Sequence, residues 1–153
     1  MEPVTNADTE LAAVRARRAE LRGTLDYVEI TLAAPAYGRA VVWGETVHDA
    51  LVTLAGDFAA HVEVTEGPGG LHQTILTGDV RLTHGVDQLT AEHQQLAAEI
   101  ASLVVDSDGP VGKEHVTELR DRATALLAHL IRHRQRGADL VYEAYETDIG
   151  GAG

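Results

Sequence analysis

The sequence predicts an all-α protein, a compact and acidic up-down-up-down bundle of four antiparallel helices. Four stretches carry apolar residues at helical spacing, and gaps rich in Gly, Pro, Asp or Ser separate them. Aromatic residues make up only 4% of the chain, so the core must consist of Leu, Val, Ile and Ala, which favours close-packed helices. Apolar and polar residues nowhere alternate over more than about four positions, so no strand is expected.

The predicted helices cover residues 9–33, 42–66, 80–105 and 113–146 of a single domain that spans 1–153. The segment 34–38 (APAYG) ends the first helix, and 67–70 (GPGG) ends the second. Leu71 to Leu76 can form one short turn before the third helix. The segment 106–110 (DSDGP) has the composition of a turn. Short connections between long helices imply antiparallel neighbours.

Charge and composition limit the partners. The net charge of −12 repels phosphate backbones and anionic lipids, so we expect neither nucleic-acid nor membrane binding. No apolar run approaches the roughly 20 residues that span a bilayer. The absence of cysteine excludes thiolate sites and disulfides. Residues 1–8 lack the basic start and apolar core of a secretory signal, and we expect a cytoplasmic protein.

The chain contains eight histidines, and helical periodicity predicts that half of them face the core. His93 lies at the centre of the apolar stripe of its helix, four residues after Leu89. His61 follows Phe58 by three residues, and His133 has a companion, His129, one turn earlier on the same side. The remaining histidines are predicted to be solvated: His48, His72, His84 and His115.

Inward histidines on three helices indicate a metal site, because imidazole binds zinc, iron, copper and nickel. The i, i+4 pair of His129 and His133 can hold one ion. A metal would also satisfy ring nitrogens that otherwise cost roughly 1–3 kcal/mol each when buried without partners. Hydrogen-bonded core histidines are the alternative reading. Three carboxylates near these stripes can complete a metal site: Asp57, Glu66 and Glu29.

The heights of the histidines along the bundle argue against one site. Counting residues from each connection puts His61 and His133 at one level. His93 then lies some eight residues further along, roughly 12 Å away at 1.5 Å per residue. Helices that start at different heights could close that gap, whereas ideal straight helices of equal alignment would keep the rings apart.

Three segments resemble the hemerythrin-like (HHE cation-binding) family. They are 61–66 (HVEVTE), 89–96 (LTAEHQQL) and 129–133 (HLIRH). The resemblance implies a non-haem di-iron centre inside a four-helix bundle, and a protein that handles or senses dioxygen, peroxide or nitric oxide. Iron is the implied cofactor, with zinc as the alternative. The implied metal ligands come from His61, His93, His129 and His133.

The chain departs from the family pattern at three positions. Thr65 stands where a carboxylate is expected, Leu89 where a second histidine is expected, and Arg134 where an aspartate is expected. A reduced histidine-rich site and a metal-free helical interaction module therefore both stay open. A small metalloenzyme with a non-standard site is the third reading, so enzymatic activity stays open too. Tyr142 and Tyr145 near the end of the last helix suit a homodimer contact.

Overall fold

A computed structural model describes residues 6–151, where all the regular secondary structure is helical, which confirms the all-α prediction. It contains four long α-helices, a short α-helix and one 3₁₀ turn. In chain order these are α1 (Asn6–Ala33), α2 (Ala40–Glu66), α3 (Leu71–Gly78), η1 (Val80–Leu82), α4 (Thr83–Ser107) and α5 (Lys113–Gly151). Residues 1–5, part of the segment that lacks the features of a signal peptide, lie outside the described range.

The connection after α2 is more structured than predicted. The expected single turn at Leu71 is a helix of 8 residues, and residues 80–82 form a 3₁₀ turn ahead of α4. The Asp79 carboxylate accepts the backbone N–H of Arg81 at 3.0 Å, which starts that turn. The third long helix therefore begins at Thr83 and ends at Ser107, later at both ends than the sequence predicts.

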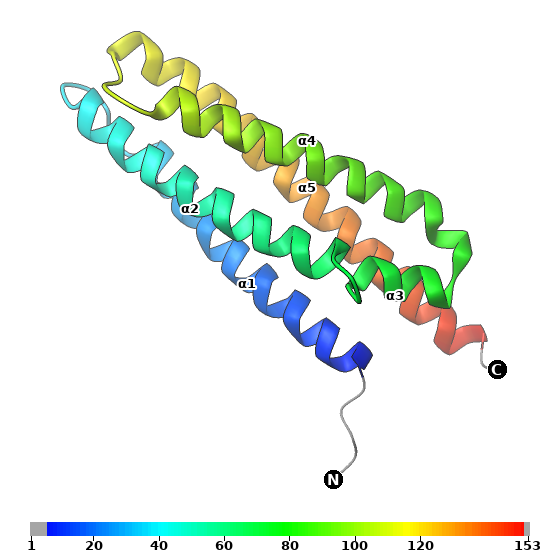
Figure 1. Ribbon diagram of the computed structural model, residues 1–153. Coiled ribbons are helices and arrows are strands. Elements are labelled where there is room, and N and C mark those ends of the chain that lie inside the picture. The colour runs from blue at the N-terminus through cyan, green and yellow to red at the C-terminus, as the bar shows by residue number, and fades with distance from the viewer. Residues whose placement is uncertain (1–5, 152–153) are drawn as a thin grey trace.

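The four long helices pack against each other (Figure 1). α1 lies against α2 and α5, and α4 lies against α2 and α5 on the other side. The chain reverses after α1 and after α4 at one end of the molecule, while α3 and η1 lie towards the opposite end. Gly38 and Gly109 make these reversals with φ of 72° and 87°, a backbone conformation that favours glycine.

The buried apolar side chains form two clusters along the helices. The larger one contains Phe58 of α2, Leu96 of α4 and Leu130 of α5. The smaller one packs α3 against the ends of α1, α4 and α5, and it includes Leu89 and Leu140. The segments 90–95 and 131–139, which carry His93 and His133, therefore connect one cluster to the other.

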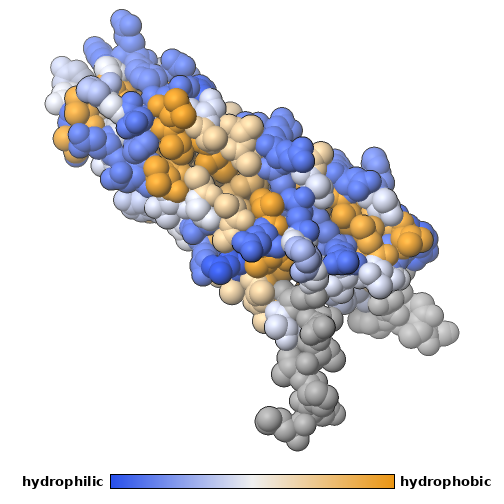
Figure 2. Space-filling view, in the orientation of Figure 1, coloured by the Kyte–Doolittle hydropathy of each residue, from blue (hydrophilic) through white to orange (hydrophobic). Residues whose placement is uncertain are grey.

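Hydrophilic side chains cover much of the face shown in Figure 2, with apolar atoms in patches between them. The largest exposed apolar side chains lie on several helices and turns, and include Tyr37, Val80, Val105 and Ile30. None of the described helices combines the length and the apolar character that crossing a membrane requires.

Candidate metal centre

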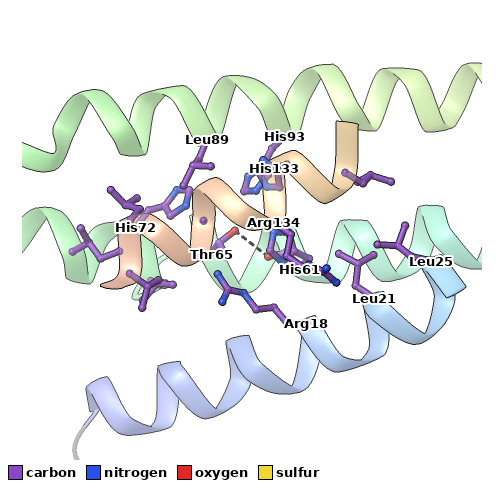
Figure 3. Close-up of a pocket in the computed structure, with 16 residues that line it drawn as sticks. Arg18, Leu21, Leu25, His61, Thr65, His72, Leu89, His93, His133 and Arg134 are labelled. Carbon is purple, nitrogen blue, oxygen red and sulfur yellow. Dashed lines mark hydrogen bonds between the residues drawn. The ribbon is translucent and has the colours of Figure 1, made fainter. Parts of the chain in front are cut away.

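Three buried histidines from three helices meet where the two apolar clusters join. His61 of α2, His93 of α4 and His133 of α5 are 6%, 2% and 4% exposed. One nitrogen of each lies within 4.8 Å of the others, so the group could hold a metal ion. The ring centroids are 5.1 Å apart for His61 and His93, 4.7 Å for His93 and His133, and 5.8 Å for His61 and His133. Figure 3 shows this convergence beside a cavity.

The expected 12 Å separation of His93 from the other two rings is wrong. Residues 67–82 form α3 and η1 towards the far end of the molecule, so α4 enters the bundle from beyond the end of α2 (Figure 1). The first turns of α4 therefore lie beyond the level of His61, and the helix reaches that level only near His93. Counting residues from each connection assumed that the helices start at equal heights.

Carboxylates hold two of the three rings from behind. The Nδ1 of His93 lies 2.6 Å from Oε2 of Glu66, and the Nδ1 of His133 lies 3.1 Å from Oε1 of Glu92. A carboxylate only accepts hydrogen bonds, so each Nδ1 carries the proton and each Nε2 keeps its lone pair. A carboxylate behind an imidazole is the usual support of a metal-bound histidine, because it fixes the ring and raises its basicity.

His61 lacks such a partner. Its Nδ1 is buried and makes no hydrogen bond to any described residue. The ring stacks on Phe58 with centroids 5.8 Å apart, and Phe58 also touches the edges of the other two rings. A buried nitrogen without a partner costs roughly 1–3 kcal/mol. A bound metal ion or ligand would relieve that cost, so this observation fits a ligand-binding role for His61.

Burial keeps the triad neutral at pH 7. It is the main cause that lowers the pKa of His61 to about 4, and repulsion by His133 and Arg18 adds to it. Burial likewise holds the pKa of His93 well below its usual range. Burial also lowers the pKa of His133, although the hydrogen bond to Glu92 opposes that effect. Neutral imidazole is the form that binds metal, so the site needs little deprotonation before an ion enters.

The other predicted ligands lie outside this group. His129 is turned towards the outer side of α4, with Nδ1 3.2 Å from Glu99 and Nε2 4.0 Å from Glu92. It does not share the triad because four residues advance a helix by about 400°, which leaves the two rings some 40° apart. Asp57 accepts a hydrogen bond from the Thr24 hydroxyl, away from the histidines.

Glu66 and Glu29, the other two predicted carboxylate ligands, also lie outside the triad. Glu66 touches the site only through Nδ1 of His93, and its side chain is 26% exposed. Burial raises the pKa of this carboxyl. Glu29 is exposed on α1 and lines a separate surface depression with Ile131. Of the i, i+4 pair on α5, only His133 therefore belongs to the triad. The rings that meet it come from other helices.

Three of the four histidines predicted to be solvated are not fully exposed: His115 is half-buried at the start of α5, and the other two make contacts with described residues. His72 of α3 is 7% exposed, and its ring stacks parallel to that of His93 with centroids 5.6 Å apart. Its Nδ1 lies 3.3 Å from the Thr90 hydroxyl. His48 is half-buried, with Nδ1 3.0 Å from the Ser107 hydroxyl. His84 is exposed as predicted.

The burial of His72 has a signal in the sequence. It precedes Ile75 by three residues and Leu76 by four, the spacing of one helix face. Because the sequence analysis predicts only a short turn at Leu71 to Leu76, it does not assign His72 to a helix face. Glu92 is the other missed residue: it is 7% exposed and also accepts from Arg136. A carboxylate beside a core histidine in sequence lies about 100° away from it, which suggests exposure unless a third helix covers it.

A cavity opens beside the three rings (Figure 3). Leucines from α1, α3, α4 and α5 form much of its apolar wall, and it has room for about two water molecules. His72 and Leu71 of α3 close one side. Two arginines also line it, Arg18 from α1 and Arg134 from α5. The arrangement leaves one side of the histidine triad accessible to a small molecule.

No protein-family model, no curated protein and no solved structure matches this chain. The class of site therefore rests on its own geometry: a buried histidine triad, two supporting carboxylates and an adjoining cavity.

Proposed function

We propose that this protein binds one transition-metal ion through His61, His93 and His133 and presents an open coordination position to a small molecule. The observation that carries the proposal is the hydrogen bonding of the three ring Nδ1 atoms. Two rings are fixed by carboxylates on Nδ1, and the third has a buried Nδ1 without a partner among the described residues. Core histidines that served packing alone would not need three nitrogens turned to one point.

Three imidazoles suit a single ion with at least one exchangeable position. The three ring nitrogens lie within 4.8 Å of one another, close enough for all three to hold one ion together. The bound ion would supply Lewis acidity at that position. The chain supplies the rest: Glu66 and Glu92 orient the rings, and Phe58 and the leucines make the surroundings of the triad largely apolar.

We propose a single ion rather than the di-iron pair that the hemerythrin resemblance implies. Thr65, Leu89 and Arg134 occupy the positions where that pattern expects further ligands, and all three line the cavity. A hydroxyl, an alkyl chain and a guanidinium cannot replace carboxylate and imidazole ligands. The antiparallel up-down-up-down arrangement of hemerythrin-like bundles remains part of this proposal, with the second metal position lost.

Iron is the metal that we propose, and zinc is the alternative. Imidazole ligands accept both, so the donor set does not decide between them. Iron would make the cavity a place for dioxygen, peroxide or nitric oxide, which the protein would handle or sense. The room for about two waters suits ligands of that size.

The test is metal analysis of protein purified without an affinity tag, after addition of ferrous iron under anaerobic conditions or of zinc or manganese. We expect about one ion per chain and a higher melting temperature with rising free metal, because the ion binds the folded state. His93→Ala and His133→Ala should remain helical and lose the stoichiometric ion.

His84→Ala is the matched control, since His84 is exposed, and it should keep the ion. His129→Ala separates the triad from the i, i+4 pair and should also keep it. A wild-type protein that binds none of these metals would overturn the proposal in favour of a metal-free interaction module. Full metal content in both triad variants would place the ligands elsewhere.

A further inference from the structure

We propose that Arg18 and Arg134 form an anion-binding subsite beside the histidine triad, and that the small molecule it takes is a planar monoanion with oxygen ends, of the size of nitrite or formate. This inference rests on the proposed function and names the chemical class of its ligand. The two arginines come from α1 and α5, helices far apart in sequence, and both line the cavity.

The two guanidinium groups have no counterion among the residues that the structure describes. Neither makes a hydrogen bond or an ion pair with any residue in the described part of the chain. The chain has 24 acidic and 12 basic residues, so unpaired arginines in an inward position are unexpected on composition alone. By contrast, Arg136 lies on the same helix as Arg134 and pairs with Glu92.

The two charges also repel each other and the triad. Burial is the main cause that lowers the pKa of Arg18, and the positive charge of Arg134 lowers it further. The charge of Arg18 in turn contributes to the low pKa of His61. Like charges held together in partial burial destabilise the protein unless an anion compensates them. None of the cavity-lining residues is a carboxylate, so the lining itself supplies no compensating charge and an anion in the cavity would supply it.

The backbone of α5 makes room for this arrangement. A Cβ added at Gly137 would lie 3.2 Å from Nη2 of Arg18, closer than a side chain normally tolerates. Glycine one turn after Arg134 thus lets the Arg18 guanidinium lie against α5 on the side of the cavity. The helix accepts this residue although glycine in a helix interior costs roughly 0.5–1 kcal/mol relative to alanine.

Size and shape define the anion. The cavity has room for about two waters, which limits the anion to about the size of nitrite or formate and excludes an aromatic or sugar-bearing one. A guanidinium presents its donors in a planar fork, which matches two oxygens of a planar oxyanion. Nitrite or formate could be held by this fork while one of its atoms faces the open side of the triad.

The experiment is calorimetric titration of nitrite into the zinc-loaded full chain and into chelator-treated chain. Arg18→Gln and Arg134→Gln should each weaken nitrite binding by about tenfold or more, as expected for loss of a charge-assisted hydrogen bond. Both should keep wild-type zinc stoichiometry and helix content. Arg22→Gln and Arg132→Gln are the matched controls, exposed on the same two helices, and should bind nitrite within about twofold of wild type.

Arg18→Lys keeps the charge without the fork, and we expect an affinity between those of wild type and Arg18→Gln. Benzoate should not compete with nitrite, because it exceeds the cavity. Zinc-loaded protein that binds no nitrite, or binds it equally well in all variants, overturns the subsite and leaves the metal proposal intact. If the chain takes up no metal, the metal proposal fails. The chelator-treated chain then decides the subsite: arginine-dependent nitrite binding supports it, and its absence overturns it.

Discussion

Lowering the pH should destabilise the metal-free protein through His61. In the unfolded chain this imidazole takes up a proton below about pH 6.5. In the folded protein burial lowers its pKa to about 4, so the proton is excluded over the interval between. The unfolded state then binds more protons than the folded state, and stability falls as the pH drops from about 6.5 towards 4.

The expected size follows from that interval. Each pH unit inside it removes about 1.4 kcal/mol from the free energy of unfolding for one such group. Between about pH 6.5 and pH 5, the titration of His61 alone should therefore lower the free energy of unfolding by roughly 2 kcal/mol. His61 is 6% exposed, so solvent screens this effect little. His72 and His93, whose pKa values burial also lowers, should add to the loss.

The assay is urea unfolding followed by circular dichroism, with a chelator present, at about pH 7 and about pH 5. His61→Leu removes the titrating group and should lose roughly 2 kcal/mol less than wild type over this range. It should be at least as stable as wild type at pH 7, because the buried Nδ1 has no described partner to lose. His84→Gln, at an exposed position, should follow wild type. An identical pH dependence in His61→Leu and wild type would refute the reasoning.

Glu92→Gln should weaken metal binding by about ten- to a hundredfold, since it removes the charge that supports a triad ring. Competition with a chromophoric chelator measures this, and Glu99→Gln, which touches no triad member, should change little. Gly44→Ala should destabilise by about 1–3 kcal/mol, because the new Cβ would lie 2.6 Å from Cγ2 of Val111. Gly56→Ala, where nothing lies within 4 Å, should instead stabilise by about 0.5–1 kcal/mol in the same urea experiment. Equal effects of the two alanines would contradict the packing described around α2.

Helical periodicity alone is enough to predict much of the fold and part of the candidate site. Four amphipathic stretches separated by glycine-rich turns specify an all-helical chain, because each stretch must bury one face. The same periodicity predicts the inward direction of His61, His93 and His133, all of which are buried. A side chain's direction around its helix axis is a local property, set by 3.6 residues per turn, so the sequence determines it.

Heights along the bundle and contacts between helices are not local. The level of His93 depends on how far residues 67–82 carry the chain before α4 begins, and only the packed structure decides that. The burial of His72 and Glu92 depends on which neighbouring element covers them. Arg18 of the first helix and Arg134 of the last line the same cavity, which also depends on how the helices pack. Helical periodicity was enough to place His61, His93 and His133 on inward faces. Tertiary packing decided that His72 is buried as well, which of the rings meet and which charges face them, because these depend on contacts between segments distant along the chain.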